Sequence, residues 1–165
     1  MVAAVHDALS VATGADMRAL GHRLATLLRA GDLVVLSGDL GAGKTTLTQG
    51  IAAGLGVRGP VTSPTFVIAR VHPSLVGGPL LVHVDAYRLA GWDELEDLDL
   101  EAALSEAVTV VEWGSGLAEG LADDRLELSI WRAHGAGAAD AEMSEVRTVQ
   151  IRPVGSRWAD FALPD

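Results

Sequence analysis

Residues 38–46 form a glycine-rich turn that ends in a lysine and two threonines, and these residue types suit the binding of phosphate groups. Their sequence, Gly-Asp-Leu-Gly-Ala-Gly-Lys-Thr-Thr, satisfies the spacing G-x-x-x-x-G-K-[ST] of phosphate-binding loops. Glycines allow backbone N–H groups to close around an anion, and a helix that starts there adds unpaired N–H groups and the positive end of its dipole. We therefore predict a nucleotide phosphate site within residues 38–46.

Two side chains of this loop have separate expected roles. Lys44 is expected to reach the β- and γ-phosphates and to stabilise charge during catalysis, and the hydroxyl of Thr45 is expected to bind Mg²⁺. Of the 12 lysine and arginine residues in the chain, Lys44 is the single lysine. A compact ammonium at this one position indicates a site where a rigid, planar guanidinium would fit poorly.

The loop needs a strand before it and a helix after it, and the flanking sequence predicts both. Residues 33–36 are apolar and contain adjacent valines, which is typical of a buried strand, whereas residues 45–55 repeat an apolar side chain every four positions, as in a helix. A capping-box pattern at residues 13–16 predicts another helix, whose apolar positions extend to Leu28 and for which Gly31 is the expected stop.

The rest of the chain is expected to supply further strands and one acidic segment. Residues 92–107 have seven acidic side chains and no basic one, which indicates one or two short helices with a solvated face. Residues 133–142 form an Ala/Gly-rich link. The expected strands lie at residues 80–85, 108–112, 126–131 and 147–152, with an edge strand within residues 1–12 and a loop leading into a strand at residues 61–69.

Two acids close two of the expected strands. Asp85 ends residues 80–85 and Glu112 ends residues 108–112. Because the carboxyl ends of parallel strands share one edge of the sheet with the phosphate loop, both carboxylates are candidates for holding the metal or acting in catalysis. A capping role remains the alternative for each of them.

Other polar residues have both a functional and a structural interpretation. Thr62, Ser63 and Thr65, hinged by Pro64, resemble a switch that senses the γ-phosphate, or they form a plain turn. Arg70 and Arg88 are candidates for neutralising transition-state charge, or they belong to surface ion pairs. His83 is interpreted as a packed or hydrogen-bonded histidine rather than a metal ligand, and Trp113 as a core residue.

The composition restricts the class of protein. A chain of 165 residues with 49% apolar residues suits one compact domain, and its net charge of −10 gives no general attraction to nucleic acid or anionic membrane. The absence of cysteine excludes disulfides and thiol catalysis, and without a recognisable signal peptide or bilayer-spanning segment the expected location is cytoplasmic. The chain also lacks asparagine, so the Asn-Lys-x-Asp guanine motif is absent and ATP is favoured by elimination.

Four short motifs, in order, give the chain a specific resemblance. They are residues 36–46, Thr-Ser-Pro-Thr-Phe at residues 62–66, His-Val-Asp-Ala-Tyr-Arg-Leu at residues 83–89 and Val-Glu-Trp at residues 111–113. Together they resemble the bacterial TsaE (YjeE) ATPases of tRNA threonylcarbamoyladenosine biosynthesis, over about residues 10–152. The resemblance implies a single-domain α/β fold, a P-loop NTPase-like three-layer sandwich with a mostly parallel central sheet and C-terminal antiparallel strands. Residues 1–152 would form the ATPase domain and residues 153–165 a C-terminal tail.

The resemblance also implies an activity, partners and site residues. It implies ATP and Mg²⁺ as ligands, slow ATP hydrolysis without partners, and association with TsaD and TsaB, so that tRNA is met only indirectly. The resemblance assigns magnesium to Thr45 and Glu112, and it places Asp85 near the γ-phosphate or the water of the metal. The phosphate-binding residues that it implies are Gly41, Ala42, Gly43, Lys44, Thr45 and Thr46. Thr13 and Arg132 lie near the adenine in this interpretation.

Two other functions remain open at this point. In a small-molecule kinase, Asp85 or Glu112 would be the base for a substrate hydroxyl, but such enzymes usually need an arginine-bearing lid, which the acidic residues 92–107 suit badly. In a non-catalytic module, nucleotide binding would only set the shape that a partner recognises.

Overall fold

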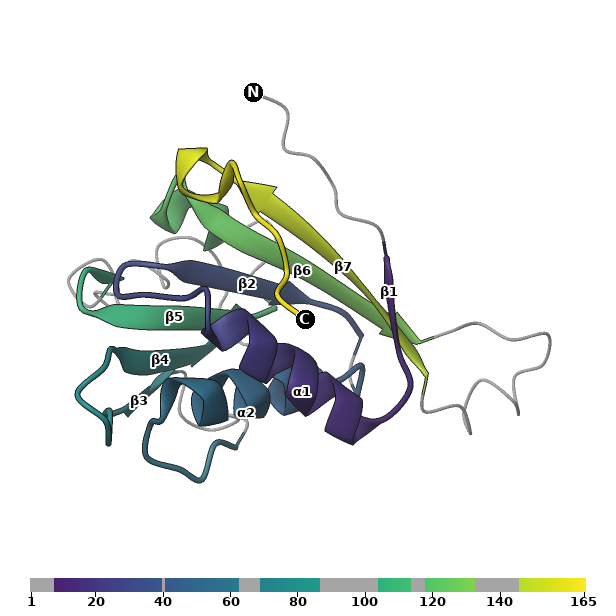
Figure 1. Cartoon of the computed structure of the whole chain (residues 1–165), viewed down its shortest axis with the longest axis horizontal. Helices are drawn as coiled ribbons and strands as arrows, with labels where there is room; N and C mark the ends of the chain where they lie inside the picture. The colour runs from purple at the N-terminus through teal and green to yellow at the C-terminus, as the bar shows by residue number, and fades with distance from the viewer. Residues whose placement is uncertain (1–7, 40, 63–68, 87–103, 114–117, 133–145) are drawn as a thin grey trace.

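Within the described part of the chain, a seven-stranded sheet with two helices on one face forms the framework of the protein (Figure 1). The computed structural model describes residues 8–39, 41–62, 69–86, 104–113, 118–132 and 146–165. The helices are α1 (Gly14–Ala25) and α2 (Lys44–Leu55), with short 3₁₀ turns η1 (Ala118–Leu121) and η2 (Ser156–Trp158). The strands are β1 (Leu9–Val11), β2 (Leu33–Ser37), β3 (Ala69–His72), β4 (Leu80–Asp85), β5 (Ala107–Glu112), β6 (Arg125–Arg132) and β7 (Arg147–Val154).

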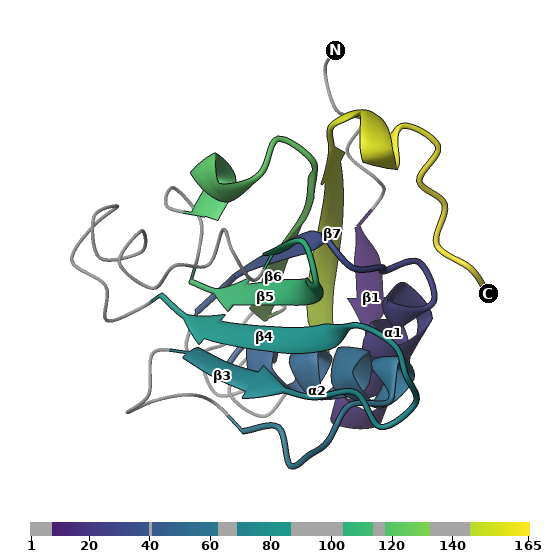
Figure 2. The same ribbon diagram turned by 90° about the vertical axis from the view of Figure 1, so that its left-hand side faces the viewer.

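The centre of the sheet is parallel and its margins are antiparallel. The strand order is β1-β7-β6-β2-β5-β4-β3, in which β6, β2, β5 and β4 run parallel, while β7, β1 and β3 pair antiparallel with their neighbours. Figure 2 shows β1 and β7 crossing the direction of β4 and β5, so the sheet is strongly twisted. The predicted α/β fold with a parallel centre and C-terminal antiparallel strands is confirmed.

The apolar run of β2 forms a central strand because both of its faces are covered. Val34 and Leu36 pack with α1 and α2 in the larger core cluster, whereas Leu33 and Val35 face the second cluster with Leu104 and residues next to η1. A strand that is buried on both faces has apolar residues at consecutive positions, as residues 33–36 do. The parallel pairing with β5 and β6 then brings the carboxyl ends of three strands to one edge.

The two helices approach closely because glycines stand at their contact. A Cβ on Gly21 of α1 would lie 2.7 Å from the backbone nitrogen of Ile51, and a Cβ on Gly50 of α2 would collide with the carbonyl of Arg18. The side chains that α1 buries, Met17, Leu20 and Leu24, then join Leu47 and Ile51 over the sheet. This contact fixes α1 beside the start of α2.

The structure departs from the predicted elements in a few places. α1 ends at Ala25 rather than near Leu28, because the N–H groups of the next three residues bond to carbonyls three positions back instead of four, which replaces the α-helix with tighter turns. β7 continues to Val154, and the following turn buries Trp158 in the larger core cluster. The acidic residues 92–103, the link 133–142 and the predicted switch residues Ser63, Pro64 and Thr65 lie outside the described residues. No helix in the described part of the chain has the length and apolarity to cross a membrane.

Candidate functional site

The predicted phosphate-binding loop, residues 38–46, lies between β2 and α2 and has glycines where its backbone has positive φ angles. Gly38, Gly41 and Gly43 have φ angles of +151°, +77° and +116°, a region of backbone conformation that other residues rarely adopt. Gly43 is the N-cap of α2, and no side chain caps this helix. The first N–H groups of α2 are thus left for an anion, as the sequence predicts.

Lys44 stands at the start of α2 and is almost fully buried within the loop. Its Nζ donates to the carbonyl oxygens of Gly38 at 2.7 Å and Asp39 at 2.9 Å, and it lies 3.8 Å from the centroid of the Trp113 ring. Burial lowers the pKa of Lys44 below its ordinary value, although the charges of Glu112, Asp39 and Asp85 oppose the shift. The ammonium is therefore poorly hydrated and is aimed across the loop, where anionic phosphate oxygens would stabilise it.

Thr45 and Glu112 meet at the next position of the helix. The hydroxyl of Thr45 lies 3.1 Å from Oε1 and 3.4 Å from Oε2 of Glu112, which is buried at the end of β5. These residues are 67 positions apart in the chain, and the parallel pairing of β2 with β5 brings them together. A hydroxyl and a carboxylate at the start of the helix form the oxygen donor set that a phosphate-bound Mg²⁺ uses.

Asp85 lies beside Glu112 at the same edge of the sheet. The two residues are register partners of the parallel strands β4 and β5, and both are buried, with 8% and 3% of their surfaces exposed. Two carboxylates side by side in a low dielectric repel each other unless a cation is near. Among the described residues no group of three His, Cys, Asp or Glu side chains is placed to hold a metal unaided. The donors fit Mg²⁺ shared with phosphate oxygens rather than a metal held by protein alone.

His83 is buried beneath these acids and supports Glu112. Its Nε2 bonds to Oε2 of Glu112, and its side chain has no exposed surface. The interpretation of His83 as a hydrogen-bonded histidine is confirmed. Trp113, interpreted from the sequence as a core residue, is instead half-buried with its ring against Lys44, and its backbone has a φ of +62°.

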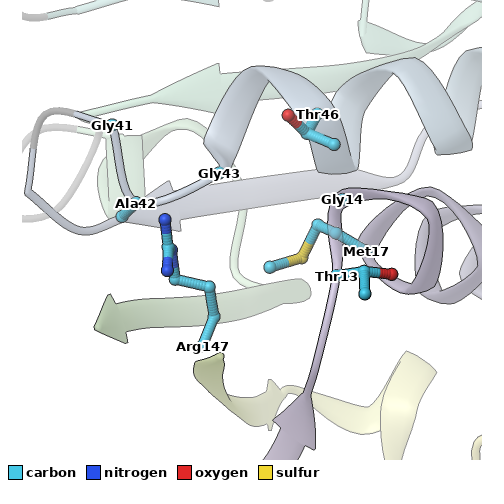
Figure 3. Close-up of a pocket in the computed structure, with 8 residues that line it drawn as sticks. All are labelled: Thr13, Gly14, Met17, Gly41, Ala42, Gly43, Thr46 and Arg147. Atoms are coloured by element: carbon cyan, nitrogen blue, oxygen red, sulfur yellow. The ribbon is translucent and has the colours of Figure 1, made fainter. Parts of the chain in front are cut away.

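A pocket of about 230 Å³ opens beside the loop, between the start of α1 and the start of β7 (Figure 3). Thr13 caps α1 by accepting from the N–H of Asp16 at 3.1 Å, and it also lines the pocket. Figure 3 shows Arg147 reaching from β7 toward Ala42, with Met17 on the opposite side. The residues that line the pocket are Thr13, Gly14, Met17, Gly41, Ala42, Gly43, Thr46 and Arg147.

The predicted residues divide into those that the structure brings to this site and those that it does not. Arg132 reaches the loop from the end of β6, where its Nη2 donates to the carbonyl of Gly41 at 3.3 Å. Arg70 is exposed on β3 at the far margin of the sheet, and Arg88 lies outside the described residues. Sequence reasoning did not identify Arg147, because its place at the site follows from the pairing of β6 with β7, in which it lies opposite Arg132.

The chain is similar to known proteins over most of its length. The family model described as "Threonylcarbamoyl adenosine biosynthesis protein TsaE" matches residues 11–139. A tRNA threonylcarbamoyladenosine biosynthesis protein TsaE of Streptomyces coelicolor is 67% identical over 144 residues, which cover 87% of this chain and 94% of the relative. The protein of the same name from Bacillus subtilis is 41% identical over 144 residues, covering 87% of this chain and 83% of the relative.

A solved structure supports the same assignment at the level of the fold. The crystal structure of Bacillus subtilis YdiB superposes with a TM-score of 0.72 at 29% identity, covering 96% of this chain and 91% of the other. The family model spans more than half of the chain, and the Streptomyces protein aligns over most of its own length. The chain therefore belongs to the TsaE family of threonylcarbamoyladenosine biosynthesis proteins.

Proposed function

We propose that this protein binds ATP with Mg²⁺ at the loop formed by residues 38–46 and hydrolyses it in the cytoplasm as a subunit of the complex that makes threonylcarbamoyladenosine in tRNA. TsaD and TsaB are the proposed partners, whose turnover the hydrolysis supports. The single observation that carries the proposal is the contact of the Thr45 hydroxyl with Glu112, immediately after a glycine loop that leaves the N-terminus of α2 uncapped.

The roles of the side chains follow from their positions. Lys44 would exchange its bonds to the loop carbonyls for phosphate oxygens, while the N–H groups after Gly43 hold the same anion. Thr45 and Glu112 would hold the magnesium ion, which neutralises charge on the phosphate oxygens. Glu112 is the better metal carboxylate because it already contacts Thr45.

Asp85 is assigned a role beside the metal rather than on it. Asp85 is the last residue of β4 and lies next to Glu112. Its negative charge is among those that raise the pKa of Lys44. At that place it would orient a water molecule at the γ-phosphate or accept a hydrogen bond from the water of the metal. The pocket between Thr13 and Arg147 is the space beside the loop that would receive the nucleoside.

The net negative charge of the chain supports the proposal that the protein meets tRNA only through its partners. A net charge of −10 works against binding a polyanion, so contact with tRNA would pass through the partners. Hydrolysis by the isolated subunit would be slow, because groups supplied by a partner are worth about 10³–10⁵-fold in phosphoryl transfer.

The proposal is tested by titrating ATP and Mg²⁺ into the wild-type protein and into Thr45→Ala and Glu112→Gln variants. Both variants should lose metal-dependent affinity for nucleotide, whereas Glu127→Gln, which lies on β6 outside the site, should not. Phosphate release is then measured with and without TsaD and TsaB. A fast ATPase in the absence of partners, or phosphate recovered in a small-molecule acceptor, would contradict the proposed role.

A further inference from the structure

His83 is a buried polar side chain that the proposed mechanism does not use. It lies in the middle of β4, where its backbone is opposite Arg70 of β3 and Val110 of β5, and it is completely buried. It precedes Asp85 by two positions, so both side chains lie on the same face of the sheet. Because Asp85 is the register partner of Glu112, His83 is a diagonal neighbour of Glu112.

The two oxygens of Glu112 have different nearest partners. Oε2 accepts from Nε2 of His83, while Oε1 is the oxygen nearer to the Thr45 hydroxyl, at 3.1 Å. An ionised carboxylate only accepts hydrogen bonds, so His83 must donate through Nε2. The histidine thus anchors one oxygen from within the core and leaves the other directed to Thr45.

The other ring nitrogen indicates that this histidine is not present for packing alone. Nδ1 is buried and has no hydrogen-bond partner within the described residues. A polar atom left in this state costs stability that an apolar side chain of similar volume would avoid. The single bond to Glu112 is then the feature that distinguishes histidine from leucine or phenylalanine at this position.

We propose that His83 is a positioning residue for Glu112, which its Nε2–H holds in the orientation that binds a divalent cation together with Thr45. The inference rests on the proposed function, because the cation is the Mg²⁺ that accompanies the nucleotide. Hydrogen bonds to metal-binding carboxylates fix their orientation, and removing such a bond typically costs about 10- to 100-fold in metal affinity or activity.

The test compares His83→Phe with His83→Gln in the full chain. Phenylalanine fills the space without a donor, whereas the amide of glutamine places a donor near the position of Nε2. Calorimetric titration of Mn²⁺ in the presence of ADP measures metal affinity, and titration of ADP in the presence of a chelator measures affinity for nucleotide alone. We expect His83→Phe to lower Mn²⁺ affinity by about 10- to 100-fold and to leave metal-free ADP affinity unchanged, with His83→Gln restoring most of the loss.

His72 provides a matched control. It is also a buried histidine with an unpartnered Nε2 among the described residues, but its Nδ1 contacts the carbonyl of Arg58 on another part of the molecule. His72→Phe should leave Mn²⁺ affinity unchanged. In a Glu112→Gln background, His83→Phe should cause no further loss, since the residue that it positions is already altered.

The outcomes separate this inference from the proposed function. If His83→Phe does not fold, His83→Asn takes its place, because its shorter amide does not reach Glu112. Equal Mn²⁺ affinity in the wild type and the donor-free variant, or a parallel loss of metal-free ADP affinity, would overturn the positioning role alone. A wild-type protein that binds no metal–nucleotide complex would overturn the proposed function and this inference with it.

Discussion

The ammonium nitrogen of Lys44 lies 3.8 Å from the centroid of the Trp113 ring, so the one lysine of the chain is held between an aromatic face and two loop carbonyls. Trp113 directly follows Glu112 and has a φ of +62°, an uncommon conformation for a bulky residue. Its N–H donates to the carbonyl of Leu36 at 2.9 Å, which ties this strained position to the end of β2. In this backbone conformation the ring of Trp113 lies against the ammonium of Lys44.

Replacing Trp113 with leucine should destabilise the protein more than replacing it with phenylalanine. Both variants must adopt the same positive φ at position 113, but only phenylalanine keeps an aromatic face. A desolvated cation–π contact is worth about 0.5–2 kcal/mol. Urea unfolding followed by circular dichroism measures the difference in free energy. The comparison is repeated with Lys44→Met, where the two variants should become more alike; an undiminished difference would show that Lys44 is not the partner.

Lys44 should titrate below the ordinary lysine value of 10.5, because burial disfavours its charged form. Protein labelled with ¹³C-lysine gives one Cε resonance, since no other lysine exists, and its chemical shift is followed against pH. Between the lowered pKa and the ordinary one the unfolded chain binds more protons than the folded chain, so stability should rise with pH across that window. A midpoint at or above the ordinary value would contradict the buried position of Lys44.

Arg147→Ala should weaken the binding of ADP by about tenfold, the equivalent of losing roughly 1.4 kcal/mol of contact in the pocket. Arg147 lines the pocket that would receive the nucleoside, so the affinity for tripolyphosphate, which lacks a nucleoside, should change much less. Calorimetry with both ligands makes the comparison. Arg152→Ala is the control, because Arg152 lies on the same strand with a side chain that is 53% exposed. Equal losses for ADP and tripolyphosphate would assign Arg147 to phosphate instead.

Gly21→Ala should destabilise the fold by about 1–3 kcal/mol, the usual cost of overpacking. The new methyl group would meet the backbone of α2 at Leu47 and Ile51, which cannot move without separating the helices. Gly14→Ala is the matched change at the start of the same helix, where a Cβ finds only ordinary contacts, with Arg18 at 3.9 Å and Thr46 at 4.0 Å. Thermal unfolding of both variants should therefore show a loss for Gly21→Ala only.

Trp158→Ala should cost about 3–5 kcal/mol, as is typical of a large aromatic residue removed from a core. Trp158 is 4% exposed, packs edge to face with Phe161 at 6.1 Å, and belongs to the same core cluster as α1. Asp160→Ala, at an exposed position two residues later, should have little effect. A small loss for Trp158→Ala in urea unfolding would show that the terminal residues 153–165 are dispensable to the domain.

The elements around the site could be predicted from sequence because each depends on nearby residues. The turn at residues 38–46 requires glycines for its φ angles. The continuous apolar run at residues 33–36 and the valine-rich run at residues 108–112 are those of strands buried on both faces. The Thr13 cap was readable for the same reason, since its bond reaches only as far as Asp16. The end of α1 was not predictable, because the apolar pattern continues to Leu28 while the backbone changes to tighter turns after Ala25.

Contacts within the site could not be read in the same way, because they depend on which strands are neighbours. The sequence by itself determined the glycine-rich loop, its lysine and the acids at two strand ends. Only the tertiary structure decided that Thr45 meets Glu112, that His83 lies behind it and that Arg147 faces the loop. The physical reason is that local patterns fix backbone conformation, whereas the order β7-β6-β2-β5-β4 results from burying both faces of the sheet at once.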